Sequence, residues 1–200
     1  MDLPSSTAAD RNKEPILAVL KTVLGPRGAA LEIASGTGQH AVWFAAGMQD
    51  WEWQPTDADA GMLPVIAARI AQSGCANVRE PVLLDVASTP WPFAHRFDAI
   101  FCANMLHISP RETCGALMRG AARHLIPGGM LVTYGPYFED GVEPAPGNIA
   151  FDASLRARDA SWGIRRLEDV AEQARRAGLA FRERIAMPAN NLVLVFAAQG

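Results

Sequence analysis

The chain has 200 residues, of which 50% are hydrophobic, and a formal net charge of −3 at pH 7. This length and composition support one substantial hydrophobic core, so we expect a single domain over residues 1–200. The charge excludes a general attraction to nucleic acid or to an anionic membrane surface. Three cysteines without a Cys-x-x-Cys pair favour neither a disulfide framework nor a thiolate metal site.

The start of the sequence predicts no export signal. It lacks a basic segment followed by an apolar run, and the longest apolar run of the chain, Leu192–Ala198, is too short to span a bilayer. We therefore expect a cytoplasmic protein without a membrane segment.

The first half of the chain alternates between helical and strand patterns. Pro15 suits the first turn of a helix that Gly25 and Pro26 end, and the following apolar run leads into a glycine-rich turn. The expected elements are a helix over 15–24, a strand over 29–33, a helix after residue 38, a strand over 51–57, a helix over 62–73 and a strand over 77–85.

The second half continues this alternation and then departs from it. Ser109 and Glu112 form a capping-box pattern at the start of a helix. Residues 135–163 have the composition of a long loop, which we interpret as a substrate lid with a helical segment within 148–159. The other expected elements are strands over 97–103 and 130–134, a helix over 167–177, and two successive strands over 179–187 and 192–198.

The alternation predicts an α/β fold with a doubly wound, mostly parallel sheet. In such a sheet ligands bind outside the carboxyl ends of the strands, beside the first strand-to-helix turn. That turn carries Gly36 and Gly38, whose lack of a side chain permits a tight turn and a ligand against the backbone. The spacing Gly36-x-Gly38-x-x-Ala41 also satisfies a relaxed dinucleotide fingerprint, so an NAD(P)-dependent reductase is one candidate.

Acidic residues stand at or near the ends of the first three expected strands. Asp57 follows Gly38 by about twenty positions, the separation at which nucleoside-binding folds place a carboxylate on ribose hydroxyls. Asp59 competes for this role, and a helix-capping or surface aspartate is the simpler alternative. Asp85 ends the third strand, and Glu32 lies in the first, where a carboxylate suits a cationic ligand better than a diphosphate.

A reductase of this size usually needs a Tyr-x-x-x-Lys proton donor, and the tyrosines Tyr134 and Tyr137 have no such lysine. Instead, several segments together resemble the successive motifs of class I S-adenosylmethionine-dependent methyltransferases. These segments are Leu31–Gly38, Asp57, Leu84–Val86, Phe97–Ile100 and Pro127–Gly129. The whole chain, Arg11–Leu17 and Pro188–Leu192 included, is similar to a poorly characterised branch of small stand-alone members.

The resemblance implies a Rossmann-like, three-layered fold whose seven strands have the order 3-2-1-4-5-7-6, with the last strand antiparallel. It implies S-adenosylmethionine as cofactor, with Glu32 and the turn at its amino-acid end, Asp57 on the ribose, Asp85 and Val86 on the adenine, and Asn104 on the ammonium. Arg11 or Lys13 is a candidate partner of the cofactor carboxylate; both are otherwise ordinary solvated charges. The turn residues concerned are Ala34, Ser35, Gly36, Thr37 and Gly38.

Two departures from the family pattern are informative. Ala34 replaces the first glycine of the usual Asp/Glu-x-Gly-x-Gly-x-Gly motif, which narrows the turn. After the fourth strand the chain has Asn104-Met-Leu-His107, where enzymes that methylate nucleobase amino groups carry Asn/Asp-Pro-Pro-Tyr/Phe. We therefore expect methyl transfer to oxygen, nitrogen or sulfur of a small molecule, and no nucleic-acid partner.

His107 is the best candidate for a general base, since imidazole can take up a proton near neutral pH. A histidine that caps the next helix or fills the crevice wall is an equal alternative. Tyr137 and Asp152 are further catalytic candidates, depending on how the lid folds. No two histidines have metal-ligand spacing, so no metal is expected.

Two further questions stay open at this point. Arg156, Arg158, Arg165 and Arg166 cluster around the lid, where they are either a solvated face or a site for an acidic small substrate. The chain could also be a non-catalytic cofactor-binding module that acts through a protein partner. Turnover of a metabolite panel would separate an enzyme from such a module.

Overall fold

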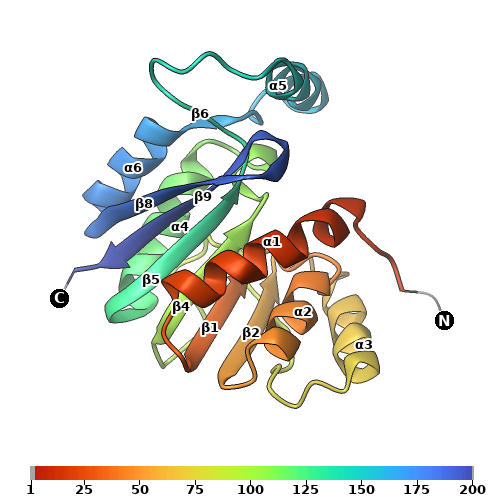
Figure 1. Ribbon diagram of the computed structural model, residues 1–200. Coiled ribbons are helices and arrows are strands. Elements are labelled where there is room, and N and C mark those ends of the chain that lie inside the picture. Colours follow the sequence, from red (N-terminus) through yellow and green to blue (C-terminus); the bar gives the residue numbers. More distant parts are fainter. Residues whose placement is uncertain (1–2, 200) are drawn as a thin grey trace.

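A computed structural model describes residues 3–199 and contains a seven-stranded sheet (Figure 1). From one edge to the other the strands are β3 (Val82–Leu83), β2 (Trp51–Asp57), β1 (Gly28–Ile33), β4 (Phe97–Ala103), β5 (Leu125–Gly135), β9 (Asn191–Ala198) and β8 (Leu179–Met187). Strands β1 to β5 are parallel, and β9 is antiparallel to both of its neighbours. Numbered within this sheet, the order is 3-2-1-4-5-7-6, which confirms the expected Rossmann-like fold.

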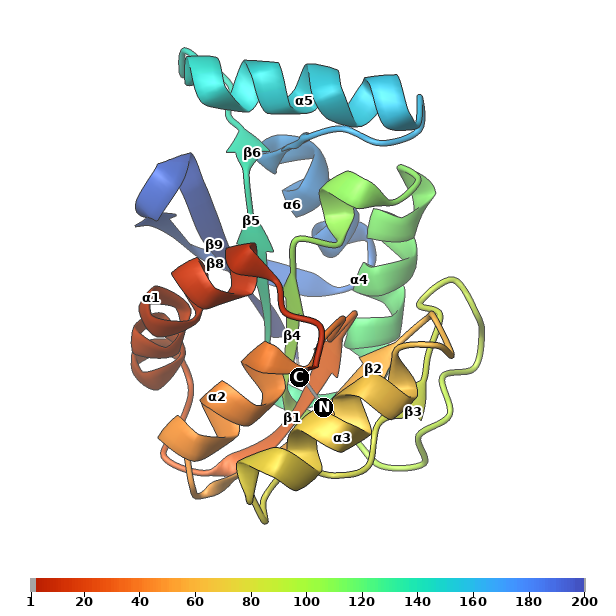
Figure 2. The ribbon, with the colours of Figure 1, turned by 90° about the vertical axis from the view of Figure 1, so that its right-hand side faces the viewer.

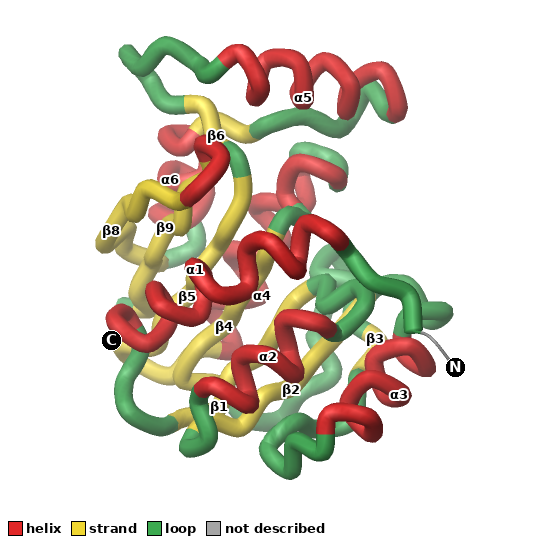
Figure 3. Tube along the Cα trace, turned by 45° about the vertical axis from the view of Figure 1, so that its right-hand side comes forward, coloured by secondary structure: helices red, strands yellow, loops and turns green. Residues whose placement is uncertain are grey.

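Helices cover both faces of the sheet and give three layers (Figures 1 and 3). The face with α1, α2 and α3 buries Ile16, Phe44 and Trp53, whereas the face with α4 and α6 buries Leu117 and Val170. Burial of such a side chain contributes about 1.5 to 3 kcal/mol. The helix bounds are α1 Thr7–Val23, α2 Gln39–Gly47, α3 Leu63–Ser73, α4 Glu112–His124, α5 Pro146–Arg158 and α6 Leu167–Arg176.

The first helix is longer than the pattern predicts. It begins at Thr7, because the Ser6 hydroxyl oxygen accepts a hydrogen bond from the Ala9 N–H and caps it. Pro15 therefore lies inside α1 and not in its first turn, so that expectation was wrong. The extra turns carry the buried side chain of Asn12 over the edge of the sheet where the strands end.

Three other boundaries differ from the expectation. The third strand is reduced to β3, an edge strand preceded by Pro81, which lacks the N–H that a longer ladder would need. The Ser109 hydroxyl donates to the Leu106 carbonyl, so the expected capping box does not form and α4 starts at Glu112. Strand β5 starts at Leu125, because the Pro127–Gly129 turn stays within a strand whose register with β4 shifts.

Residues 135–163 contain more structure than a loop. Helix α5 lies across one end of the molecule, as Figure 2 shows, and the short strands β6 (Tyr137–Phe138) and β7 (Arg165–Arg166) pair beneath it. Its bounds agree closely with the expected helical segment within 148–159. The 3₁₀ turns η1 (Leu106–Ile108) and η2 (Pro188–Asn190) complete the element list. No helix among residues 3–199 is long and apolar enough to cross a membrane.

Candidate functional site

The glycine turn after β1 adopts a backbone that leaves room for a ligand. Ala34, Gly36 and Gly38 all have positive φ, at 55°, 55° and 74°. A methyl group added at Gly36 would meet no atom within 4 Å, whereas one at Gly38 would lie 3.3 Å from the Ile66 Cα. Gly38 is therefore needed for helix packing, and Gly36 borders open space. Ala34 tolerates its left-handed conformation at a cost of about 1 to 2 kcal/mol.

Asp57 joins the end of β2 to this turn. One carboxylate oxygen, Oδ2, accepts a hydrogen bond of 2.7 Å from the Gly36 N–H, and Oδ1 accepts one of 2.9 Å from the Asp59 N–H. Asp59 uses its own carboxylate on the Gly61 N–H and so faces the start of the next helix. The structure thus brings Asp57, and not Asp59, against the turn.

Asp85 and Val86 lie beside the same edge of the sheet. The Leu84 N–H donates to the Asp57 carbonyl at 2.9 Å, which aligns the segment after β3 with the end of β2. The Asp85 side chain is exposed and accepts from the Ala87 N–H, while Val86 is buried. An acceptor and an apolar side chain are therefore adjacent here, as the recognition of an adenine ring requires.

Glu32 is buried inside the sheet and does not open onto solvent. Only 2% of its surface is exposed, and its Oε2 accepts a 2.5 Å hydrogen bond from the indole N–H of Trp53. Burial, helped by the nearby Asp57 carboxylate, raises the pKa of Glu32 to about 8, although hydrogen bonds from Trp53 and Ser35 oppose the shift. The carboxyl group is therefore largely protonated at neutral pH, and the charge next to the turn resides on Asp57.

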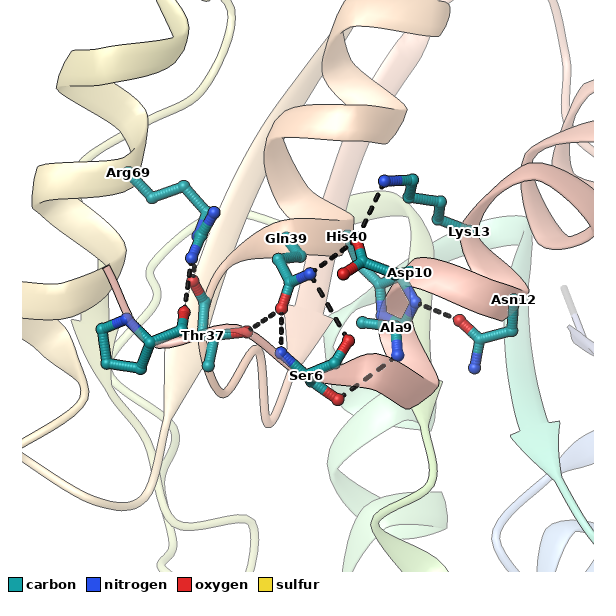
Figure 4. Close-up of polar contacts among 10 residues, drawn as sticks. Ser6, Ala9, Asp10, Asn12, Lys13, Thr37, Gln39, His40 and Arg69 are labelled. Carbon is teal, nitrogen blue, oxygen red and sulfur yellow. Dashed lines mark hydrogen bonds and ion pairs between the residues drawn. The ribbon is translucent and has the colours of Figure 1, made fainter. Parts of the chain in front are cut away.

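Residues of the N-terminal segment lie over the glycine turn (Figure 4). The Gln39 amide, at the start of α2, accepts from the Ser6 N–H and the Thr37 hydroxyl and donates to the Asp10 carboxylate. Lys13 pairs with Asp10 at 2.9 Å and lies over the Trp43 ring, whereas Arg11 is exposed. Of the two basic candidates for binding the cofactor carboxylate, Lys13 is thus already paired with Asp10.

A second contact ties the same segment to the turn. Arg69 of α3 donates to the carbonyls of Pro4 and Thr37 (Figure 4). The His40 ring nitrogen Nε2 lies 2.6 Å from the Asn12 amide oxygen, and burial lowers the pKa of His40 to about 4. The imidazole is therefore neutral and donates to Asn12. Residues on α2 and α3 therefore hold the N-terminal segment beside the glycine turn.

Asn104 and His107 meet at the end of β5. Asn104 has a left-handed φ of 59° and its N–H donates to the Tyr134 carbonyl. A methyl group added at Gly135 would lie 3.4 Å from His107 Nδ1 and 3.8 Å from Asn104 Oδ1. The absence of a side chain at Gly135 thus lets both groups approach the strand end.

His107 is enclosed, and its enclosure affects its protonation. Its ring packs edge to face against Phe151 of α5, with centroids 5.4 Å apart. Burial lowers the pKa of His107 to about 4, and the Arg165 charge adds to this. The imidazole is accordingly neutral at physiological pH, able to accept a hydrogen bond but weak as a base.

The other two catalytic candidates, Tyr137 and Asp152, form hydrogen bonds with other groups of the protein. The Tyr137 hydroxyl is buried and donates to the Thr133 hydroxyl at 2.9 Å, and burial raises its pKa. Asp152 pairs with Arg156 and accepts from the Ile164 N–H. Their catalytic roles stay predictions. Among residues 3–199, no three histidine, cysteine or acidic side chains come together in a group that could hold a metal ion.

Comparison with a family model adds to this geometry. The model of DUF938, described as a protein of unknown function, matches residues 3–198. The chain belongs to the DUF938 family. Solved structures similar to this DUF938 chain show its fold to be that of class I S-adenosylmethionine-dependent methyltransferases.

Three such structures illustrate the similarity. An O-methyltransferase family protein from Burkholderia thailandensis has a TM-score of 0.81 at 16% identity, covering 96% of this chain and 58% of its own. An S-adenosylmethionine-dependent methyltransferase has a TM-score of 0.79 at 22% identity, with 96% and 56% covered. An O-methyltransferase family 2 protein from Planctomyces limnophilus, in complex with apigenin, has a TM-score of 0.76 at 18% identity, covering 92% of this chain and 61% of its own. The DUF938 chain spans less than two thirds of the length of these proteins.

The residues at the turn fit a nucleoside cofactor with a cationic centre. The open space beside Gly36 would accept the ligand, and Asp57 supplies a carboxylate with lone pairs beyond those used by the backbone. Within residues 3–199, Arg69, which binds the Thr37 carbonyl, is the one basic side chain that donates into the glycine turn. This donor set suits a sulfonium nucleoside better than a diphosphate.

Several residues of the DUF938 site were not singled out from the sequence. Gln39 and Arg69 act through backbone carbonyls and N–H groups, which no motif records. Arg165 was named from the sequence only as a solvated charge or a site for an acidic substrate, whereas it binds the Leu106 carbonyl. Gln39 directly follows the glycine turn, so its position as the first residue of a helix was a usable signal. Gly135 ends a predicted strand, and a glycine there indicates a close approach by neighbouring groups.

Proposed function

We propose that this protein transfers a methyl group from S-adenosylmethionine to a small-molecule acceptor at oxygen, nitrogen or sulfur. The observation that carries the proposal is the hydrogen bond from the Gly36 N–H to Asp57, which fixes an acid beside an open, left-handed turn. In sheets of this order the ligand lies outside the carboxyl ends of the strands. The methyltransferases of similar fold support this choice of cofactor.

The residues at this edge have complementary roles in the proposed complex. Asp57 would bind the ribose hydroxyls, Asp85 the adenine amino group, and Val86 one face of the ring. The backbone of Ala34–Gly38, with Ser35 and Thr37, would lie beside the amino-acid end, and Glu32 would orient it through the turn. Asn104 would offer its carbonyl to the ammonium, and Arg11 or Lys13 would pair with the carboxylate.

When bound, the cofactor supplies an electrophilic methyl group on a sulfonium. The protein's own contribution is to position the acceptor in a closed site, because effective alignment alone can account for much of the acceleration. His107 is neutral and lies next to Asn104, so it can accept a hydrogen bond from the acceptor and orient its nucleophilic atom. Helix α5, whose Phe151 packs on His107, would exclude water as a lid.

Two glycines offer a matched test of the cofactor site. Gly36 and Gly74 both have positive φ and face open space, but Gly74 lies at the far end of α3. The two alanine substitutions should therefore destabilise the protein equally, each by about 1 to 2 kcal/mol. Gly36→Ala should also weaken binding of S-adenosylhomocysteine at least about tenfold, since its methyl enters the space of the ligand. Gly74→Ala should leave binding unchanged.

The measurement is isothermal calorimetry with S-adenosylhomocysteine and NADPH side by side. Binding of S-adenosylhomocysteine and not of NADPH supports the proposal, and binding of NADPH alone would reject it in favour of a reductase. Cofactor binding without methylation of any compound in a broad metabolite panel would instead indicate a non-catalytic binding module.

A further inference from the structure

A cavity lies beneath the proposed lid, close to the end of β5. It has a volume of about 220 Å³ and lies between β6, the loop before α5, and the turn joining β8 to β9. Its wall includes Leu192, which pairs with Gly135 across β5 and β9. Gly135 is also the residue against which Asn104 and His107 lie. One wall of the cavity is therefore paired, through the sheet, with the strand end at which Asn104 and His107 lie.

The charged groups around this cavity leave one acid unpaired. Arg184 donates two hydrogen bonds, of 2.9 and 2.7 Å, to the two carboxylate oxygens of Glu139, which neutralises both side chains. Glu143 also lines the cavity, and among residues 3–199 no cationic group lies within ion-pair distance of it. The net charge of the lining is therefore negative.

The amide side chains in the wall, like the unpaired carboxylate, favour a ligand that donates hydrogen bonds. Asn148 uses its NH₂ group on the Asn190 carbonyl at 3.1 Å, which joins α5 to the hairpin turn. Asn191 uses its NH₂ group on the carbonyls of Pro188 and Ala189. The carbonyl oxygens of these two amides remain for a ligand, together with the Glu143 carboxylate. The wall thus favours a ligand that donates hydrogen bonds.

The arginines near the lid do not oppose this preference. Arg156 pairs with Asp152, and Arg166 with Asp140. Arg158 lies over the Trp162 ring, 5.0 Å from its centroid, and Arg165 donates to backbone carbonyls of η1. None of the four lines the cavity. An acidic small substrate would therefore find no free cation there.

We propose that the acceptor is a small amphipathic molecule with a cationic, hydrogen-bond-donating group, such as an ammonium, which binds at Glu143, Asn148 and Asn191. This inference rests on the proposed function for its claim that the ligand is the acceptor. The apolar part of the molecule would lie against Phe138 and other apolar side chains of the wall, among them Val142, Met187 and Leu192. The cationic group serves recognition; the atom that receives the methyl group is a separate part of the molecule.

Three probes of nearly equal size separate charge from shape: phenethylamine, phenethyl alcohol and phenylacetate. Their dissociation constants, measured by ligand-observed NMR at neutral pH, should follow the order amine, alcohol, carboxylate, from tightest to weakest. An exposed ion pair is worth up to about 1 kcal/mol, so we expect the amine to bind about fivefold more tightly than the alcohol. Equal binding, preference for the carboxylate, or no binding of the amine would overturn the proposal.

Two matched charge variants test whether Glu143 is responsible for the preference for the amine. Glu143→Gln should abolish the preference for the amine, whereas Glu183→Gln should preserve it, since Glu183 is exposed on β8 and does not line the cavity. An equal response of the two variants would contradict a specific role of Glu143. S-adenosylhomocysteine binding is measured on the same samples. If it fails while the amine preference persists, the ligand class of the cavity stands and only its role as the acceptor site is refuted.

Discussion

The glycine turn and the proposed lid, residues 135–163, face the same edge of the sheet, but they are held in different ways. Asp57, Gln39 and Arg69 bind backbone groups of the turn or of the segment that crosses it. The lid helix α5 leaves Ile149 and Phe151 exposed by 49% and 40%. This difference indicates that the proposed cofactor site is already formed without a ligand, whereas the proposed acceptor site can change its conformation.

Only a few side chains attach α5 of the proposed lid to the rest of the described structure. Leu155 is the one side chain of α5 that is fully buried among the described residues, and Asn148 and Asp152 supply single hydrogen bonds to the hairpin turn and to Ile164. Such a helix has few contacts to lose when it moves, which is typical of segments that open for a substrate. The predictions below test each side of the comparison.

The largest expected effect concerns Glu32, at the centre of the rigid side. Its pKa is about 8 in the folded protein against 4.5 in the unfolded chain, so the folded state holds the proton more tightly between these values. The stabilisation is complete below pH 4.5 and is lost as the pH rises through 8. Relative to Glu32→Gln, the free energy of unfolding of the wild type should fall by about 4 kcal/mol between pH 5 and 9.

Urea unfolding of both proteins at several pH values measures this difference. Glutamine keeps an acceptor for the Trp53 indole and leaves His40 and His107 in place, so their titration cancels in the comparison. Parallel stability curves would show that Glu32 is solvated, and the rigid, buried character of this side would be refuted.

The second prediction concerns the fixed base of the lid. Arg165 donates to the carbonyls of Leu106 and Ser109, on either side of His107. Arg165→Met leaves both acceptors without a charged donor and should lower the free energy of unfolding by about 3 kcal/mol. Arg166→Met removes only exposed ion pairs, with Asp140 and Glu168, and should change the free energy of unfolding by less than about 1 kcal/mol. Thermal or urea unfolding compares the two, and equal losses would contradict an anchor at Arg165.

The third prediction returns to the cofactor side. Asp57→Ala removes the acceptor of the Gly36 N–H and the proposed partner of the ribose, and should weaken S-adenosylhomocysteine binding about 100-fold. Asp50→Asn, at the start of the same strand, changes the charge equally and should have no effect on calorimetric affinity. Undiminished binding by Asp57→Ala would remove Asp57 from the site.

The same contrast explains what the sequence could predict. The periodicity of the sequence predicts the mostly parallel α/β sheet, and the spacing from Gly38 predicts the position of Asp57. The order of the strands follows only from the resemblance to class I methyltransferases. Pro15 and Ser109 were misleading because each has a frequent local role, at a helix start or in a capping box. Here the Ser6 hydroxyl caps α1 ahead of Pro15, and the Ser109 hydroxyl donates to the Leu106 carbonyl instead. Sequence patterns alone do not decide between such competing local hydrogen bonds.

The other side depended on contacts between distant residues. The hydrogen bonds from Asn148 to Asn190, and from Arg165 to Leu106, join positions more than 40 apart in the chain. The burial that lowers the pKa of His107 comes partly from Phe151, which no spacing rule connects to it. The sequence could name His107 as a candidate but could not predict its protonation state.

The smallest effect is expected at that contact, and it would show how closely the lid covers the crevice. Phe151→Ala exposes the His107 ring and should raise its pKa from about 4 toward the ordinary value, by about one unit. Ile149→Ala removes a similarly exposed apolar side chain of α5 and should leave the pKa unchanged. The measurement is an NMR titration of the imidazole. If both variants leave the pKa near 4, the core alone buries His107 and α5 does not act as its cover.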